Sequence, residues 1–126
     1  MIVGVGVDLV ELERIREIHQ RHGARFTDRV LTPAEKAYVL EDRDPAARLA
    51  GRWAAKEAAV KALGTGIAAG VGWRDLEILP DEFGKPVLSF SGGALTRARQ
   101  LNATRWHVSI THSKSMAMAQ VLLERD

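Results

Sequence analysis

The feature that most constrains the fold is the stretch from Pro45 to Leu63, because its composition is that of one long helix. It is dense in Ala, Leu, Arg, Lys and Glu, which are strong helix formers, and Gly64-Thr65-Gly66 would end it. Asp44 is the candidate N-cap residue. Small side chains along this helix favour close approach of another backbone segment; they are Ala54, Ala55, Ala58, Ala59 and Ala62.

The segments before this helix predict one strand and two further helices. Ile2 to Val7 is rich in β-branched residues, which is typical of a buried strand, and this strand should end at Asp8. A helical stripe extends from about Leu9 to His22, and Gly23 is its candidate terminator. Thr32-Pro33-Ala34-Glu35 combines an N-cap, a proline at the first helical position and a capping-box glutamate, so a helix should begin there.

The segments after the long helix predict two hairpins and one helix. The last hairpin is too apolar to lie at an exposed edge of a sheet. Together these elements predict an α+β fold: a single small domain, residues 1–126, with an antiparallel sheet packed against the long helix. In chain order they are a hairpin of Leu76–Leu79 and Pro86–Phe90, a helix over Ala94–Leu101, and a hairpin of His107–Thr111 and Met116–Leu123.

Composition restricts the class of protein. The 126 residues, 46% hydrophobic and 27% charged, suit one compact domain, and a domain of this size can bury leftover apolar surface by self-association. The absence of cysteine excludes disulfides, thiolate metal sites and a cysteine nucleophile. No basic leader and no apolar run of membrane-spanning length is present, so we expect a soluble cytoplasmic protein. With a net charge of only +2, attraction to an acidic partner must come from local clusters.

Three charged residues are candidates for chemistry. Glu57 and Lys61 are four residues apart on one face of the predicted long helix, where a solvated ion pair is the ordinary interpretation. The ordinary interpretation of Asp8 is an N-cap for the helix that begins near Leu9. If the strand carrying Asp8 packs against the helix carrying Glu57, two carboxylates converge, which is costly unless a proton or a cation lies between them. Mg²⁺ is the natural cation, because it takes one or two protein carboxylates and completes its shell with water and phosphate oxygens.

Groups that suit a phosphate-rich ligand occur in two places. They are Arg48, Arg52, Lys56 and Lys61 on the long helix, and Thr111-His112-Ser113-Lys114 at the tip of the last hairpin. His112 is equally well explained as an ordinary turn residue. Gly64 and Gly66 match neither a Walker loop nor a dinucleotide fingerprint, so their simplest role is to cap the helix and turn the chain.

A cluster of arginines marks the first helix. If that helix continues past Gly23, one face carries Ile18 among Arg14, Arg21, Arg25 and Arg29. A solvated face is the usual explanation for such charges. An arginine face with an apolar centre is also what binding of an acidic helix would require.

Three segments together resemble the bacterial holo-acyl-carrier-protein synthase family of 4′-phosphopantetheinyl transferases. The resemblance follows the order of the chain over nearly its whole length, including Phe26–Pro33 and Gly84-Lys85-Pro86. The three segments are Gly4-Val5-Gly6-Val7-Asp8 with Glu11 and Arg14, Arg52-Trp53-Ala54-Ala55-Lys56-Glu57-Ala58 with Lys61, and His107-Val108-Ser109-Ile110-Thr111-His112.

This resemblance implies an enzyme that transfers the 4′-phosphopantetheine arm of coenzyme A to a serine of an acyl carrier protein, in support of fatty acid biosynthesis. It implies that Asp8 and Glu57 bind Mg²⁺ and that both act in catalysis with Lys61. Family members are trimers with active sites between neighbouring subunits, so Asp8 and Glu57 of one chain are expected beside His112 of the next. We expect the remaining contacts at two sets of residues: for coenzyme A, Arg52, Lys61, Gly64, Ser109, Thr111 and His112, and for the carrier, Arg14, Ile18, Arg21 and Arg25.

Two rival hypotheses come from other classes of protein. A nucleic-acid-binding module would use the arginine face, but the chain has little excess positive charge, only 6% aromatic residues and no recognised binding motif. A non-catalytic docking subunit would need none of the four candidate residues Asp8, Glu57, Lys61 and His112. We therefore expect an enzyme whose partners include neither a nucleic acid nor a membrane.

Overall fold

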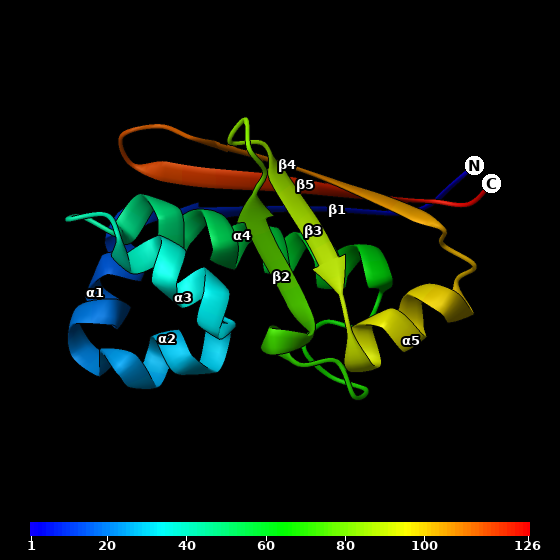
Figure 1. Ribbon diagram of the computed structural model, residues 1–126, viewed down its shortest axis with the longest axis horizontal. Helices are drawn as coiled ribbons and strands as arrows, with labels where there is room; N and C mark the ends of the chain where they lie inside the picture. The colour runs from blue at the N-terminus through cyan, green and yellow to red at the C-terminus, as the bar shows by residue number, and fades with distance from the viewer.

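A three-stranded antiparallel sheet and the helix covering one of its faces form the frame of the molecule (Figure 1). The computed structural model describes residues 1–126. The strand order is β1-β5-β4, and every pairing is antiparallel. The frame consists of β1 (Ile2–Glu11), β5 (Met116–Glu124), β4 (Arg105–His112) and the predicted long helix, α4 (Ala46–Leu63).

Small residues allow α4 to lie directly on the sheet. Gly4 and Gly6 of β1 face the helix, and a Cβ atom at either position would collide with a backbone carbonyl group of Ala62 or Ala58. Ala58 is fully buried at this contact. The prediction that the alanines of the long helix admit close approach of another backbone segment is therefore confirmed.

The other elements pack on the same side of the sheet as α4 (Figure 1). One hydrophobic cluster of 29 buried residues joins α4 to the sheet and to these elements. The α+β prediction is confirmed, and so are the positions of both hairpins. The remaining elements are α1 (Leu12–His22), α2 (Ala24–Val30), α3 (Pro33–Leu40), the 3₁₀ turn η1 (Trp73–Asp75), β2 (Leu76–Pro80), β3 (Pro86–Phe90) and α5 (Gly92–Gln100).

The first strand and the first helix differ from the prediction. Strand β1 runs on to Glu11, so Asp8 lies inside a strand and is not an N-cap. Its pairing with β5 continues as far as Met116, which explains the extra length. Gly23 ends α1 with φ of 53° and starts the separate helix α2, so the arginines before and after it do not share one continuous helical face.

The starts of the next two helices illustrate strong and weak capping. Thr32 and Glu35 form the predicted capping box: Thr32 Oγ1 accepts a hydrogen bond from Glu35 N at 3.3 Å, and Thr32 N donates to Glu35 Oε1 at 2.9 Å. The N-cap of α4 is Pro45 and not Asp44 as predicted. Asp44 still contributes, because its Oδ1 accepts a long hydrogen bond of 3.4 Å from Ala46 N.

The face of the sheet that points away from α4 is apolar and open. Val5, Val7 and Leu9 of β1 are 54%, 51% and 59% exposed, and Met118 of β5 adds to the same surface. Strand β4 pairs only with β5 and is an edge strand, so the prediction that the last hairpin avoids an edge is wrong for β4. Its outward residues include Ser109 and Thr111, whose polar side chains are compatible with exposure to water.

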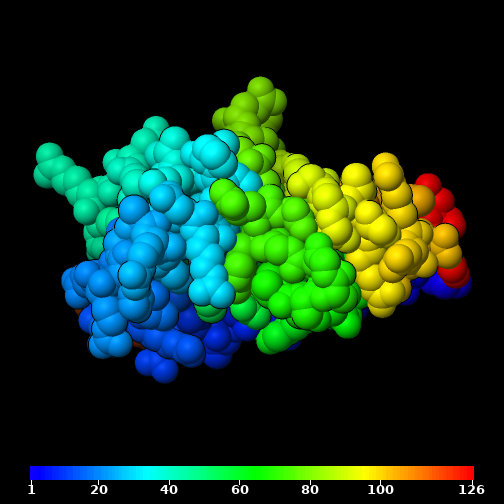
Figure 2. All heavy atoms as spheres, turned by 90° about the horizontal axis from the view of Figure 1, so that it is seen from below, coloured from blue at the N-terminus to red at the C-terminus, as the bar shows by residue number.

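The opposite surface is formed by the helices and the small sheet (Figure 2). Helices α1 to α3, in blue and cyan, lie beside the green and yellow segments, and the turn between β2 and β3 stands out from the surface. None of the helices combines the length and the hydrophobicity needed to cross a membrane.

Candidate active site

The contact between β1 and α4 brings three predicted site residues together. Asp8 follows Gly4 and Gly6 on the side of β1 that faces α4, and Glu57 and Lys61 lie one turn apart on that helix. Lys61 Nζ donates hydrogen bonds to Asp8 Oδ1 at 3.1 Å and to the carbonyl oxygen of Val7 at 3.0 Å. The ion pair of Lys61 is therefore with Asp8 on the strand and not with Glu57 on its own helix.

The electrostatics of this carboxylate pair, Asp8 and Glu57, favour a bound cation. Burial raises the pKa of Glu57, and the negative charge of Asp8 raises it further, while Lys61 opposes the shift. The carboxylate form of Glu57 is thus less favourable than it would be in free solution. A proton or a metal ion would relieve the repulsion.

The two carboxylates of Asp8 and Glu57 suit Mg²⁺ better than they suit a metal ion whose ligands all come from the protein. No third histidine, aspartate or glutamate joins Asp8 and Glu57. Two carboxylates without sulfur or imidazole are a typical protein contribution for Mg²⁺, which draws its other ligands from water and phosphate. The residues present therefore fit the predicted ion.

A second group of predicted residues lines a cleft of about 530 Å³ between α4, β4 and the β2–β3 turn. We call it the Arg52 cleft. Its wall is mainly cationic and polar, since it contains two guanidinium groups, an imidazole and two hydroxyl groups against one carboxylate. The residues that give it this character are Tyr38, Asp42, Arg48, Arg52, Thr111 and His112.

Arg52 is fixed in the wall of this cleft. Its residue is only 6% exposed, and its Nε donates a hydrogen bond of 3.2 Å to the carbonyl oxygen of Ile78. Burial lowers the pKa of the guanidinium group, Tyr38 and Glu35 oppose that shift, and the positive charge of Arg48 adds to it. An anion in the cleft would offset both penalties.

Lys56, which the sequence offered as a phosphate ligand, cannot reach one. It is fully buried, and its Nζ donates to Glu35 Oε1 at 2.6 Å, to Val30 O at 2.6 Å and to Trp73 O at 3.0 Å. These contacts use all three donors of the ammonium group. Lys56 is thus a structural residue, and the interpretation as a phosphate ligand is wrong.

Gly64 and Ser109 lie outside the Arg52 cleft. Gly64 caps α4 in a left-handed conformation, with φ of 77°, three residues after Lys61. Ser109 is exposed on β4, and its neighbours in the strand, Val108 and Ile110, point the other way.

One chain does not bring the carboxylate pair and the Arg52 cleft together. Asp8 lies on edge strand β1 and His112 lies on edge strand β4, with β5 between them. On α4, Arg52 and Glu57 project about 140° apart around the helix axis. Each chain therefore presents two half-sites on different sides.

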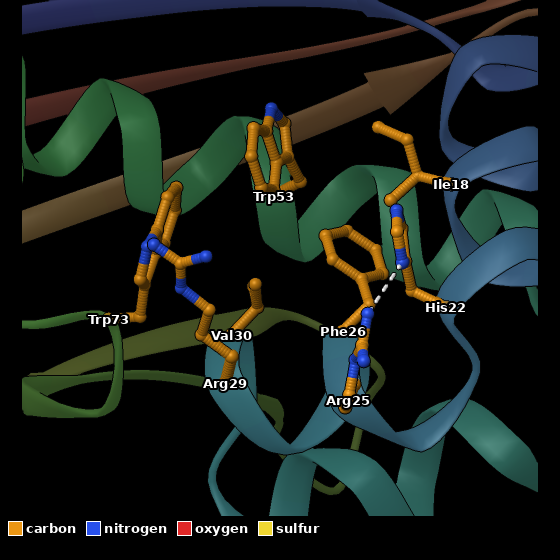
Figure 3. Close-up of a pocket in the computed structure, with 8 residues that line it drawn as sticks. All are labelled: Ile18, His22, Arg25, Phe26, Arg29, Val30, Trp53 and Trp73. Atoms are coloured by element: carbon orange, nitrogen blue, oxygen red, sulfur yellow. Dashed lines mark hydrogen bonds between the residues drawn. The ribbon is translucent and has the colours of Figure 1, made fainter.

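A third feature is a cavity of about 360 Å³ lined by α1, α2, α4 and η1, which we call the tryptophan cavity (Figure 3). The rings of Trp53 and Trp73 stack there with centroids 4.7 Å apart. Of the predicted docking residues, Ile18 and Arg25 line it, whereas Arg14 and Arg21 do not. The lining residues are Ile18, His22, Arg25, Phe26, Arg29, Val30, Trp53 and Trp73.

The sequence does not predict the aromatic residues that line the Arg52 cleft and the tryptophan cavity. No sequence pattern gives a role to Tyr38 or Trp73, or to Trp53 beyond its place in a segment that carries the family resemblance. An aromatic residue one turn from a basic or apolar patch is a weak signal, because such residues most often belong to a core. Only the fold shows that these rings border open space.

Comparison with known proteins places this chain in a family. A family model described as the 4′-phosphopantetheinyl transferase superfamily matches residues 4–120. The holo-[acyl-carrier-protein] synthase of Solidesulfovibrio magneticus is 55% identical over 124 residues, which are 98% of this chain and 99% of that protein. The synthase of Halalkalibacterium halodurans is 52% identical over 127 residues, covering 99% of this chain and 98% of that one.

Solved structures agree. Holo-[acyl-carrier-protein] synthase from Neisseria meningitidis has a TM-score of 0.89 at 36% identity and covers 99% of this chain and 100% of its own. The synthase from Bacillus anthracis, solved in complex with CoA (3′,5′-ADP), has a TM-score of 0.84 at 39% identity, with 100% and 99% coverage. Since family model, sequences and folds all match over nearly the full length, the chain belongs to the 4′-phosphopantetheinyl transferase superfamily.

Proposed function

We propose that this chain transfers the 4′-phosphopantetheine group of coenzyme A to a serine of apo acyl carrier protein and releases adenosine 3′,5′-bisphosphate. The observation that carries the proposal is the approach of Asp8 and Glu57, beside Lys61, in a chain whose full-length relatives are holo-[acyl-carrier-protein] synthases. The related synthase of Bacillus anthracis was solved with CoA (3′,5′-ADP), which supports the same co-substrate here. We expect the enzyme to act in the cytoplasm and to serve fatty acid biosynthesis.

We propose Asp8 and Glu57 as the ligands of one Mg²⁺. Bound there, the ion would neutralise negative charge on the diphosphate of coenzyme A. Lys61 lies beside the pair and can neutralise further charge on the transferred phosphate, while its contact with Asp8 keeps that carboxylate in place. Gly64, at the end of the same helix, is expected near the same end of the ligand.

The reaction forms a bond between the carrier serine oxygen and the β-phosphorus of coenzyme A and breaks the bond from that phosphorus to the leaving nucleotide. The serine proton must pass to a base. Two candidates remain, Glu57 and a water molecule at the metal site. Either would lie close to the transferred phosphate, as acceptance of the serine proton requires.

We propose that coenzyme A also occupies the Arg52 cleft, where Arg52, Thr111 and His112 face the ligand. This cleft lies away from Asp8 in one chain, so we propose a homotrimer in which the cleft of one subunit adjoins the carboxylate pair of the next. The open apolar face of the sheet supports such an assembly. Ser109 lies on that face and would then be near the subunit boundary.

We propose that the acyl carrier protein docks on α1 and the tryptophan cavity. Arg14, Ile18 and Arg21 recur at helical spacing along one side of α1, and Arg25 continues the positive charge onto α2. The arginines suit acidic side chains of a carrier helix, and the cavity beside Ile18 suits an apolar one.

The test is direct transfer. The protein is mixed with coenzyme A, Mg²⁺ and an apo carrier, and the carrier is weighed by mass spectrometry for a gain of roughly 340 Da, the mass of the transferred group. The same mixture with the Glu57→Ala protein is the control. No mass gain with any of a panel of apo carriers would contradict the proposal.

A further inference from the structure

Two arginine side chains of the Arg52 cleft share one aromatic ring. The guanidinium carbon of Arg48 lies 4.2 Å from the centroid of the Tyr38 ring, and that of Arg52 lies 4.6 Å from it. Both distances are well inside the range of cation–π attraction. Tyr38 belongs to α3, whereas both arginines belong to α4, so the ring joins the two helices at the wall of the cleft.

Each arginine also donates hydrogen bonds to oxygen atoms of the protein. Arg48 donates from one terminal nitrogen to the carbonyl oxygen of Tyr38 at 2.7 Å and to Glu41 Oε2 at 3.2 Å. Arg52 donates from Nε to Ile78 O, which leaves its two terminal nitrogens for a ligand. The two positive charges oppose each other, as the effect of Arg48 on the pKa of Arg52 shows, and the electron-rich ring offsets this repulsion.

We propose that Tyr38 is a positioning residue: its ring holds Arg48 and Arg52 ready to bind a phosphomonoester, the 3′-phosphate of coenzyme A. This inference rests on the proposed function. A planar guanidinium group binds phosphate through two parallel hydrogen bonds, so its orientation decides affinity. Thr111 and His112 of β4 also line the cleft and add donors for the same ligand.

A phosphomonoester fits this wall better than a singly charged diphosphate oxygen. Asp42 also lines the cleft, and its Oδ2 lies 3.7 Å from Arg48 Nε, so an incoming anion must compete with a carboxylate. A phosphate ester carries up to two negative charges near neutral pH, which gives it the advantage over that single charge.

The test compares Tyr38→Leu, which removes the ring, with Tyr38→Phe, which keeps it and loses only the hydroxyl group. Tyr38→Leu should weaken binding of adenosine 3′,5′-bisphosphate, measured by calorimetry, and raise the KM for coenzyme A, both about five- to tenfold. Tyr38→Phe should stay within about twofold of the natural protein. The kcat and the KM for the carrier should be unchanged in both variants.

Dephospho-coenzyme A, which lacks the 3′-phosphate, identifies the phosphate involved. Its KM should be the same for Tyr38→Leu and Tyr38→Phe, and AMP should bind both proteins equally. If Tyr38→Leu weakens coenzyme A and dephospho-coenzyme A alike, the arginines bind the diphosphate and the proposal is wrong. If Tyr38→Leu matches Tyr38→Phe toward every ligand, the ring does not position the arginines.

Failure of the inference is distinct from failure of the proposed function. A natural protein that modifies its carrier while Tyr38→Leu behaves like Tyr38→Phe overturns only the role of Tyr38. A natural protein that neither binds adenosine 3′,5′-bisphosphate nor modifies a carrier overturns both. Circular dichroism checks folding, and Tyr38→Gln replaces Tyr38→Leu if the latter does not fold, with the same expected outcomes.

Discussion

Glu57 holds an unfavourable position for a lone carboxylate. It is half-buried, and the charge of Asp8 adds to the burial that raises its pKa. Neighbouring Lys61 relieves it only in part, because its ammonium group donates its hydrogen bonds to Asp8 and to Val7 O and not to Glu57. Such a residue is stabilised when ligand and cation arrive together, which is the behaviour expected of a site that works only when occupied.

We predict that Asp8→Ala and Glu57→Ala each lower transfer by about a thousandfold or more while leaving the fold intact, because either change removes a ligand of the ion. With coenzyme A present, Mg²⁺ should raise the melting temperature of the natural protein but not of either variant. Glu82→Ala, at an exposed turn, is the matched control and should respond like the natural protein. Normal transfer by Asp8→Ala or Glu57→Ala in saturating Mg²⁺ would show that the assigned ligand is wrong.

Sequence reasoning identified the charged residues of the site but not their partners. Four-residue spacing placed Glu57 and Lys61 on one face correctly, and it made an ion pair between them the ordinary interpretation. The actual partner of Lys61 comes from a strand 53 residues away. Lys56 was misread for the same reason: the groups that bind its ammonium group lie on other elements, and only packing reveals that Lys56 is buried.

At the scale of elements, the buried ion pair of Glu35 and Lys56 links α3 to α4, and further hydrogen bonds of the two side chains extend the link to α2, β2 and η1. Glu35 of α3 accepts hydrogen bonds from Thr32 N at 2.9 Å, Ile78 N of β2 at 2.8 Å and Lys56 Nζ of α4 at 2.6 Å. Lys56 also holds carbonyl oxygens of α2 and η1, at Val30 and Trp73. This network fixes the walls of the tryptophan cavity relative to α4.

Lys56→Met should lower the free energy of unfolding by about 3–5 kcal/mol, because it leaves the Glu35 carboxylate buried without a counter-charge. Adding Glu35→Gln should recover part of that loss, since an amide is not charged. Lys36→Met removes the half-exposed pair of Lys36 with Asp28 and should cost about 1 kcal/mol or less. Denaturant unfolding at one protein concentration measures all of these; equal losses for Lys56→Met and Lys36→Met would contradict the assignment.

The next prediction concerns docking of the carrier protein on helix α1. Reversing the charge of Arg14 and Arg21 should raise the KM for the carrier about tenfold or more at low salt and leave the KM for coenzyme A nearly unchanged. Rising salt should weaken carrier binding by the natural protein more than by the double variant, because exposed charges are screened. Ile18→Ala should add a smaller loss that salt does not alter.

A solvated arginine face predicts a different result. Steady-state kinetics would then give equal carrier KM values for the natural and charge-reversed proteins at low salt. That outcome would require the docking model to be abandoned.

Most elements were predictable because their signals are local. The capping box at Thr32, the composition of α4 and the turn between β2 and β3 each need only a few neighbouring residues. The errors arose where a distant partner decides. Strand β1 continues past Asp8 because β5 pairs with it as far as Glu11, and no pattern within β1 records the length of β5.

The whole molecule presents an incomplete site and an uncovered apolar face. The carboxylate pair and the Arg52 cleft lie toward opposite edges of the main sheet, and Val5, Val7 and Leu9 are open on the face of the sheet that points away from α4. Neither fact was readable from residue spacing, because edge and face depend on strand order. A symmetric assembly would resolve both at once.

We predict a homotrimer by native mass spectrometry. Mixed trimers of Glu57→Ala and His112→Ala subunits should recover part of the transfer that each variant lacks alone, because some interfaces then join an intact carboxylate pair to an intact cleft. Trimers of either variant alone are the controls. A fully active monomer, or proven mixed trimers without activity, would count against a site shared between subunits.

The stacked indoles of Trp53 and Trp73 also give the molecule an optical reporter. The third tryptophan, Trp106, lies away from that cavity, where its Nε1 donates to Leu88 O at 2.9 Å. In a Trp106→Phe protein, all indole emission would come from the stacked pair and would respond to whatever enters beside it. Coenzyme A, bound near Arg52, would leave that emission unchanged. Stopped-flow fluorescence could then time arrival of the protein substrate apart from that of the nucleotide, without any attached dye.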